Sequence, residues 1–195
     1  MIMLIAIVSY FHTKTFRGKV IDADTKEPIE GAVVVAEWQT ETTTPTATHT
    51  NLKDVKEVLT DKNGEWSING LRGHGPIPGL SLFIPYTKEP KFTIFKPGYC
   101  PWPLGFEIGA CRATMKFTGD KEKGVGEGGT LELPKLTKRE DRLRAQRIGS
   151  SFLTATLPDK QKAKKIRNFL RLLNDEQKRL GLDQYPIWKE LENER

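Results

Sequence analysis

The chain has 195 residues, of which 37% are hydrophobic and 29% are charged, and its formal net charge is +6. This composition is typical of a globular protein and excludes a chain that is disordered throughout. The positive charge is concentrated near the C-terminus, because residues 134–195 hold 16 Lys and Arg against 9 Asp and Glu, a net of +7 by subtraction. The length suits one β-rich domain with an appendage.

Residues 1–11, MIMLIAIVSYF, form an apolar run that is too short to span a bilayer but has the length of the hydrophobic region of a signal peptide. No Lys or Arg precedes the run, and no A-x-A cleavage site follows it. Two interpretations stay open, a signal-peptide remnant or a first strand of the β-domain. We favour export, and we treat residues 1–13 as a segment separate from the domain.

Residues 16–38 read as a strand, a polar turn and a second strand running back, and the rest of the chain is expected to pack on this hairpin. Residues from Phe16 to Val20 alternate between an apolar and a polar face. Residues 32–36 are almost wholly apolar, which predicts a strand buried on both sides. Residues 24–28, DTKEP, supply the side chains and the proline of a turn.

The following segment, residues 41–51, is rich in Thr and predicts a long exposed connection. A strand resumes at residues 55–60, and Asn63-Gly64 then predicts a hairpin turn before the strand that contains Trp66 and Ile68. Further short strands are expected at residues 80–86, 90–95, 113–117 and 130–133.

Seven or so short strands at this spacing predict a mainly β protein with an antiparallel β-sandwich over residues 14–136. The alternating apolar positions give the expected core of the sandwich, which comprises Val20, Val33 or Val34, Leu59, Trp66, Ile68 and Ile94.

Cys100 and Cys111 bracket the loop CPWPLGFEIGAC. An even number of cysteines around a short loop predicts a disulfide, which favours an extracytoplasmic compartment. Two reduced, buried cysteines are the alternative. A structural zinc site is disfavoured because no CxxC pair and no paired His motif accompanies them.

The tail, residues 137–195, has helical periodicity, with helices expected at residues 138–147, 158–180 and 186–194. The middle helix presents a broad apolar arc and an opposite basic stripe, and Gly181 is a natural end for it. We expect the arc to dock on the sandwich, on the other tail helices or on a partner, through Ile166, Phe169, Leu170 and Leu173. The stripe is expected to face solvent or, as the alternative, to bind anions, through Lys160, Lys164, Arg167 and Arg171.

Three stretches carry a family resemblance: GKVIDADTKEPIEGAVV, TDKNGEWSINGL and FTIFKPGY. They resemble the carboxypeptidase regulatory-like domain, a transthyretin-like or prealbumin-like β-sandwich. The resemblance covers residues 14–99 and extends toward residue 136. It implies an extracytoplasmic, non-catalytic structural or binding module, and says nothing about the tail. The matching residues are Gly18, Val20, Asp22, Pro28, Ile29, Gly31, Ala32, Val34, Thr60, Asp61, Gly64, Trp66, Ile68, Gly98 and Tyr99.

The sequence offers little for catalysis. His12, His49 and His74 lie in unrelated segments without acidic residues at ligand spacing, so we expect neither an enzyme nor a metal or other cofactor. Carboxylates near glycine could form a weak calcium site or cap turns, and we favour turn capping by Asp22, Asp24 and Asp61. Some aromatic residues could stack on sugars or a partner instead of filling the core: Trp38, Trp66, Tyr86, Tyr99 and Trp102.

Two functions follow from this reading. The first is an exported binding or assembly module of the cell envelope or surface, whose partner is another envelope or extracellular protein, a polysaccharide or a second copy of the chain. The second is a binder of anionic polysaccharide or lipid through the basic tail. Nucleic acid is not an expected partner of an exported protein, and contact with a membrane is expected to be peripheral at most.

Overall fold

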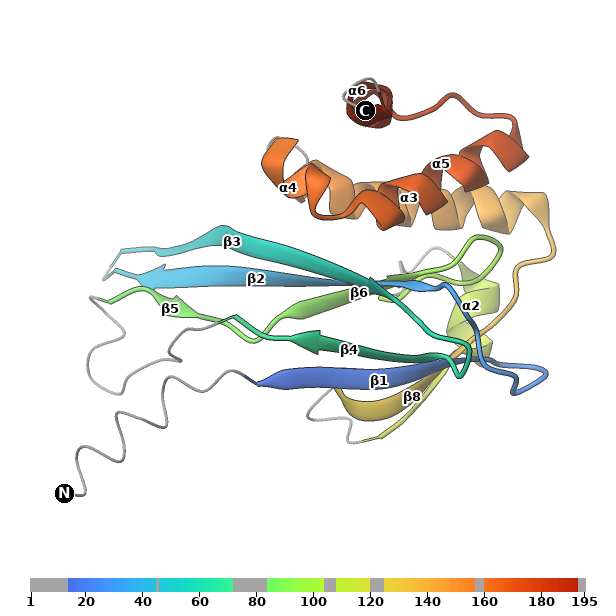
Figure 1. Cartoon of the computed structure of the whole chain (residues 1–195), viewed down its shortest axis with the longest axis horizontal. Helices are drawn as coiled ribbons and strands as arrows, with labels where there is room; N and C mark the ends of the chain where they lie inside the picture. The colour runs from blue at the N-terminus through green and yellow to red at the C-terminus, as the bar shows by residue number, and fades with distance from the viewer. Residues whose placement is uncertain are drawn as a thin grey trace.

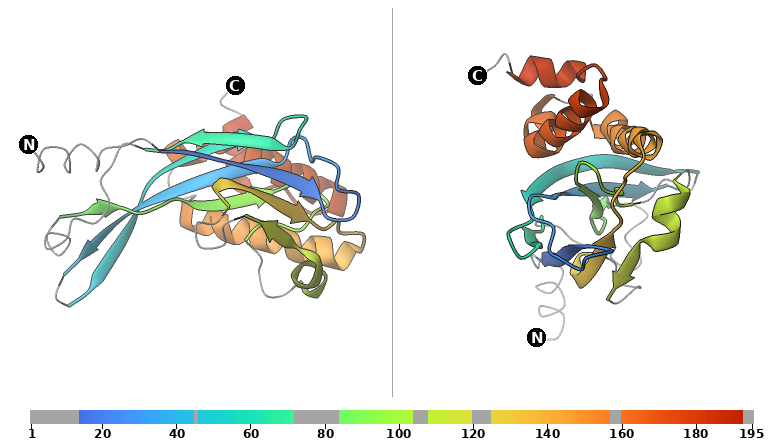
Figure 2. Two further views of the ribbon diagram at one scale, coloured as in Figure 1. Left: turned by 90° about the horizontal axis from the view of Figure 1, so that it is seen from below. Right: turned by 90° about the vertical axis from the view of Figure 1, so that its right-hand side faces the viewer.

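The structure is a computed structural model that describes residues 14–44, 46–71, 84–103, 108–119, 125–156 and 160–192. It is mainly β, with two four-stranded sheets that face one another and C-terminal helices stacked on one of them (Figures 1 and 2). The apolar run at residues 1–11 lies outside the described residues, so both interpretations of it stay predictions. No helix among the described residues is long and apolar enough to cross a membrane.

The first sheet, sheet A, has the strand order β4-β1-β8-β7. Its strands are β1 (Thr15–Asp22), β4 (Glu65–Asn69), β7 (Lys116–Thr118) and β8 (Glu127–Leu133). Strands β1 and β4 are antiparallel, as are β7 and β8, but β1 and β8 are parallel. The expectation of a wholly antiparallel sandwich is therefore wrong for this pair, because β8 follows β7 as its antiparallel partner and so lies beside β1 in the same direction.

The second sheet, sheet B, is built around its longest described pair, β2 and β3, with β5 and β6 on the other side of β2. Its strands are β2 (Val33–Thr43), β3 (Thr48–Leu59), β5 (Tyr86–Thr87) and β6 (Lys91–Phe95). The strand predicted at residues 80–86 lies largely outside the described residues.

The apolar run of β2 is buried on both faces, as predicted. Val34 and Ala36 point into the core between the two sheets, whereas Val33 and Val35 point toward the helices. The inter-sheet core also contains four other residues predicted for it, Val20, Trp66, Ile68 and Ile94, together with Trp38, which was not predicted there. Leu59 was predicted in this core wrongly: it lies on the helix-facing side of β3 near the end of the strand and is 38% exposed.

Residues 16–38 do not form a paired hairpin, because β1 belongs to sheet A and β2 to sheet B. The turn carries the chain from one layer to the next, and only an isolated bridge between Ile21 and Pro28 joins its two sides. Turn chemistry predicts the change of direction correctly. It does not predict which sheet each strand joins, since that depends on pairing with β4, β8 and β3, which lie elsewhere in the sequence.

The Asn63-Gly64 turn likewise crosses between the sheets, since β3 pairs with β2 and β4 pairs with β1. Gly64 has a φ of +73°, and a Cβ at this position would collide with the carbonyl oxygen of Val20. The turn therefore packs directly on the backbone of β1, where Val20 N donates to Gly64 O at 2.8 Å. This close approach explains the glycine, and the expected hairpin is wrong.

Two further expectations differ from the structure. The Thr-rich residues 41–51 are not a loose connection, because β2 and β3 continue to pair as far as Thr43 and Thr48 and project beyond the sandwich (Figure 2). The segment after the disulfide loop contains a short helix, α2 (Gly109–Thr114), so the strand expected at residues 113–117 begins only at Lys116. Cys111 of α2 is bonded to Cys100, a tertiary contact that a local strand pattern does not reveal.

The described part of the tail contains four helices, α3 (Arg139–Thr156), α4 (Lys160–Lys164), α5 (Arg167–Leu180) and α6 (Pro186–Glu192). The helix predicted over residues 158–180 is thus two helices, with a break at Ile166, whose φ of −122° and ψ of 39° are not helical. Gly181 ends α5 in the left-handed conformation, as predicted. Helices α3 and α5 lie over sheet B, and α6 forms an outer layer (Figure 1).

Candidate functional site

The apolar arc of α5 docks on the sandwich of its own chain. Ile166, Phe169, Leu170 and Leu173 are each 0% exposed. They share one cluster with Val33 and Val35 of β2, Val55 of β3 and Phe95 of β6, and the rings of Phe95 and Phe169 meet edge to face at 5.9 Å. The arc therefore covers the outer face of sheet B, and its use toward a second protein stays a prediction.

Two carboxylates of β3 hold the start of α5. Glu57 accepts hydrogen bonds from the amides of Asn168 and Phe169, at 2.7 and 2.9 Å, where Ile166 provides no side-chain cap. Burial raises the pKa of the Glu57 carboxyl, although these hydrogen bonds oppose the change. Asp54 pairs with Lys165 at 2.6 Å. A sandwich carboxylate therefore performs the capping that a helix usually obtains from its own N-cap residue.

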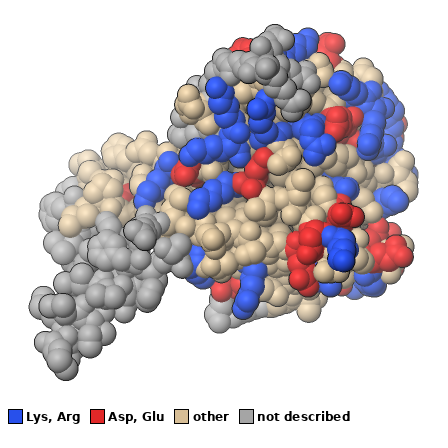
Figure 3. Space-filling view, viewed as in Figure 1, with Lys and Arg blue, Asp and Glu red and all other residues tan. Residues whose placement is uncertain are grey.

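Only some side chains of the basic stripe are exposed to solvent. Lys164 and Arg171 are exposed, whereas Arg167 is half-buried and donates to the carbonyl oxygen of Leu191 at 2.9 Å. The side chain of Lys160 lies outside the described residues. In the space-filling view, Lys and Arg are frequent over the helical layer, with acidic residues among them (Figure 3). In this view, the surface of the helical layer therefore carries both positively and negatively charged side chains.

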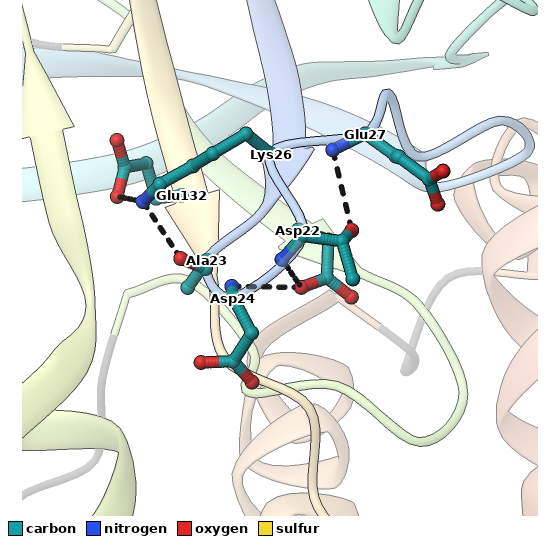
Figure 4. Close-up of polar contacts among 7 residues, drawn as sticks. Asp22, Ala23, Asp24, Lys26, Glu27 and Glu132 are labelled. Carbon is teal, nitrogen blue, oxygen red and sulfur yellow. Dashed lines mark hydrogen bonds and ion pairs between the residues drawn. The ribbon is translucent and has the colours of Figure 1, made fainter.

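The turn after β1 is closed by Asp22, as the turn-capping interpretation predicts. Its Oδ1 accepts the amides of Asp24 and Thr25 at 2.8 and 3.1 Å (Figure 4). Lys26 has a φ of 63°, and its Nζ reaches the Ala23 carbonyl and Glu132, both at 2.7 Å. These two contacts of the Lys26 side chain stabilise a left-handed backbone conformation, which residues other than glycine rarely adopt.

Asp22 also accepts a 3.0 Å hydrogen bond from the hydroxyl of Tyr99. Burial opposes ionisation of Asp22, but hydrogen bonds from Thr25, Asp24 and Tyr99 outweigh it and lower the pKa of this carboxyl. Burial and the bond to Asp22 raise the pKa of Tyr99 to about 12. The pair ties the turn to the segment that follows β6 and has a structural role.

The calcium alternative finds no support among the described residues, which contain no group of three or more His, Cys, Asp or Glu placed to hold a metal. Asp61 caps its own turn, because its Oδ1 accepts the amides of Asn63 and Glu65 at 2.9 and 2.8 Å. Asp24 is exposed. His49 lies on the projecting β2–β3 hairpin, while His12 and His74 lie outside the described residues.

Cys100 and Cys111 form a disulfide, as predicted, with their Cα atoms 5.7 Å apart. Both residues are fully buried in a small cluster with Ile108, Leu136 and Ala145. The disulfide joins α2 to the segment that follows β6, and since Ala145 belongs to α3, it also supports the first tail helix.

The aromatic candidates divide between the core and the surface. Trp38 and Trp66 are core residues, at 2% and 5% exposure. Tyr86, Tyr99 and Trp102 are half-buried, and the hydroxyl of Tyr86 donates to Glu41. Tyr99 and Trp102 also pack against the inter-sheet core. These positions give no continuous aromatic platform on a sheet face.

The described residues form an open polar hollow of about 840 Å³ on the outer face of sheet A, which we name the sheet A hollow. Its residues come from β1, β4, β8 and the turn before β4: Arg17, Gly18, Lys19, Asp61, Glu65, Trp66, Ser67, Glu127, Gly128 and Thr130. The sequence reading did not find this site. Alternation places Arg17 and Lys19 outward, but their neighbours come from strands more than forty residues away along the chain.

A β-bulge shapes the sheet A hollow. Arg17 pairs with Glu127, and Lys19 pairs with Thr130. Two residues of β8 therefore lie between these two pairs, whereas β1 has only one residue there. Gly128 lies in the bulge at a φ of +87°, and a Cβ there would meet no atom within 4 Å. The missing side chain leaves the sheet surface open between charged neighbours. In the sequence, the glycine-rich run GEGGT was the signal that could have indicated this bulge.

Comparisons with known proteins do not identify the chain. No family model matches the sequence, and neither does any curated protein. Among solved structures, the crystal structure of a 9R-lipoxygenase from Cyanothece PCC8801 is similar over 69% of this chain, at 10% identity and a TM-score of 0.23. This chain covers 17% of that protein. A similarity at this TM-score supports no inference about fold or function.

Proposed function

We propose that the protein is an extracytoplasmic, non-catalytic binding or assembly module, built on a transthyretin-like sandwich of the carboxypeptidase regulatory-like kind. The observation that supports this function is that the tail covers the outer face of one sheet and leaves the outer face of the other exposed. Sheet B is covered by the protein's own tail through the α5 arc. Sheet A presents outward side chains that are exposed, including Arg17, Glu65 and Ser67, around the sheet A hollow.

The buried disulfide supports an oxidising compartment, since such bonds persist outside the cytoplasm. The sheet A hollow contains Arg, Lys, Asp and Glu side chains but no His or Cys. It therefore lacks the Ser-His and Cys-His pairs of many hydrolases, which supports a role in recognition.

The proposal is tested with the full chain produced in its source cells. We expect the protein in the envelope or medium, with Cys100 joined to Cys111 in non-reduced peptides, and envelope material bound to it after cross-linking. Ser67→Glu, which adds a bulky negative side chain to the outer face, should lose this material. Thr50→Glu, on the projecting β2–β3 hairpin, makes the same change of charge at an exposed position and should retain it. Cytoplasmic protein with free thiols, or equal retention by both variants, would contradict the proposal.

The second candidate is an anionic-surface binder that uses the tail. The exposure of Lys164 and Arg171 on α4 and α5 favours it. Binding of this kind should weaken steeply with added salt and should be lost on changing these cations, whereas binding through the outer face of sheet A should not depend on them.

A further inference from the structure

The lining of the sheet A hollow restricts the ligand to a polar one. Arg17 and Lys19 stand on the central strand β1 and point to the outer face. Across the strand pairs, Lys19 faces Glu65 and Thr130, while Arg17 faces Ser67 and Glu127. Most apolar side chains of these strands point to the other side, into the inter-sheet core. Trp66 contributes to the lining but is only 5% exposed, so an apolar ligand would find little apolar surface to pack on.

The two cations are available. Among the described residues, neither Arg17 nor Lys19 forms an ion pair, whereas Glu127 already pairs with Lys14. Residues two apart on a strand are separated by about 7 Å along it. Two anionic groups at a similar spacing on one ligand would satisfy both cations. The Arg17 guanidinium also has the planar fork that suits a carboxylate.

The acidic residues of the sheet A hollow select against simple polyanions. Asp61, Glu65 and Glu127 are hydrogen-bond acceptors when ionised, so they favour ligand groups that donate. Polyphosphate would bring further negative charge and almost no donors, and polyaspartate would bring fewer donors for each carboxylate than a hydroxyl-rich polymer. A saccharide with carboxylates separated by hydroxyl groups supplies both kinds of group, because hydroxyls donate to the acidic residues while carboxylates meet the cations.

The shape of the site fits a chain of sugar units. A second hollow of about 300 Å³, lined by Thr15, Arg17, Gly126 and Glu127, shares Arg17 and Glu127 with the first. The two hollows thus continue along β1 from Lys19 toward Thr15. An extended ligand would occupy both hollows, whereas one compact small molecule would use only a part of this surface.

We propose that the sheet A hollow binds an acidic polysaccharide along β1, with Arg17 and Lys19 holding its carboxylates and Ser67, Thr130 and Glu65 meeting its hydroxyls. This inference rests on the proposed function and adds the chemical class of the ligand. The partner is a polymer of uronic-acid type, identified here only by its carboxylates and hydroxyls.

The test measures binding of oligogalacturonate to the full, disulfide-bonded chain by calorimetry. A neutral galactose oligomer and polyaspartate are the comparison probes. The wild type should bind oligogalacturonate more tightly than either comparison probe. Arg17→Gln with Lys19→Gln should weaken this binding about tenfold or more, since a hydrogen bond to a charged group contributes at least that factor. The control Arg171→Gln with Lys178→Gln removes the same charge from the exposed face of α5 and should bind as the wild type does.

Three results would overturn the inference: no binding of oligogalacturonate, equal or tighter binding of polyaspartate, or a loss in the α5 variant that matches the loss in the β1 variant. Circular dichroism should show both variants folded, and Thr130→Glu, which adds a negative charge beside Lys19, gives a second variant with the same expected loss. If Ser67→Glu still removes envelope material while oligogalacturonate does not bind, the proposed function holds and the ligand class is wrong. If neither is observed, both are wrong.

Discussion

Replacing Arg142 by Ala should destabilise the protein by breaking the charged contact between α3 and α5. The Nε and Nη2 atoms of Arg142 each donate to the carboxylate of Glu176, both at 2.7 Å. The side chain of Glu176 is 3% exposed. Without the guanidinium, the fold would keep a buried carboxylate that has lost its charged partner.

The magnitude follows from the geometry of this pair. Removing one partner of a buried ion pair costs about 3 to 5 kcal/mol, because the other charge is left uncompensated. The Arg142 side chain is 26% exposed, so water can reach its end of the contact. We therefore expect the lower end, about 3 kcal/mol. This is a large share of the roughly 5 to 15 kcal/mol that stabilises a typical domain.

The assay is urea unfolding of the full chain, followed by tryptophan fluorescence and circular dichroism. The matched control is Arg144→Ala in the same helix, because Arg144 is 53% exposed and lies 3.6 Å from Asp141. An exposed pair of this kind contributes at most about 1 kcal/mol. Replacing both Arg142 and Glu176 by Leu should recover most of the loss, since no charge is left buried. A cost for Arg142→Ala no larger than the control, or a double variant as unstable as the single one, would refute the reasoning.

Three further predictions concern the sandwich. Ile68→Ala should lower the free energy of unfolding by about 2 to 5 kcal/mol, because Ile68 is 3% exposed in the inter-sheet core, and a loss below about 1 kcal/mol in urea unfolding would contradict its packing. Tyr99 should titrate near pH 12 by ultraviolet absorbance, because its pKa is raised to about 12 in the fold. Its contribution to stability is complete below about pH 10, the pKa of unfolded tyrosine, and is lost as the pH rises through 12. Titration near pH 10, or an unchanged profile in Tyr99→Phe, would contradict this. Replacing Cys100 and Cys111 by Ala should cost about 3 kcal/mol on the chain-entropy account of a loop closed over 11 residues, and an unchanged urea midpoint would argue against it.

Features that depend on neighbouring residues could be predicted from the sequence. Alternation from Phe16 to Val20, burial of residues 32–36 on both faces and the end of α5 at Gly181 all follow from local geometry. The apolar arc of α5 identified its own buried residues because a helix repeats every 3.6 residues wherever it lies. The disulfide could be predicted from two cysteines at a short spacing in the sequence.

Features that depend on distant parts of the chain were decided by the tertiary structure. The pattern of β1 and β2 is the same whether they pair with each other or join different sheets, so only β3, β4 and β8 separate the alternatives. The Thr-rich hairpin is ordered by cross-strand hydrogen bonds that composition does not encode. The break at Ile166 coincides with the capping of α5 by Glu57 of β3.

The candidate site shows the same division. The sequence by itself determined that Arg17 and Lys19 face outward, because side chains alternate along a strand. Only the tertiary structure placed Glu65 and Ser67 on one side of them and Glu127 and Thr130 on the other, and only the bulge at Gly128 opened the surface between them. The register of paired strands depends on contacts across the whole sandwich, so a polar surface formed by three distant segments cannot be read from any one of them.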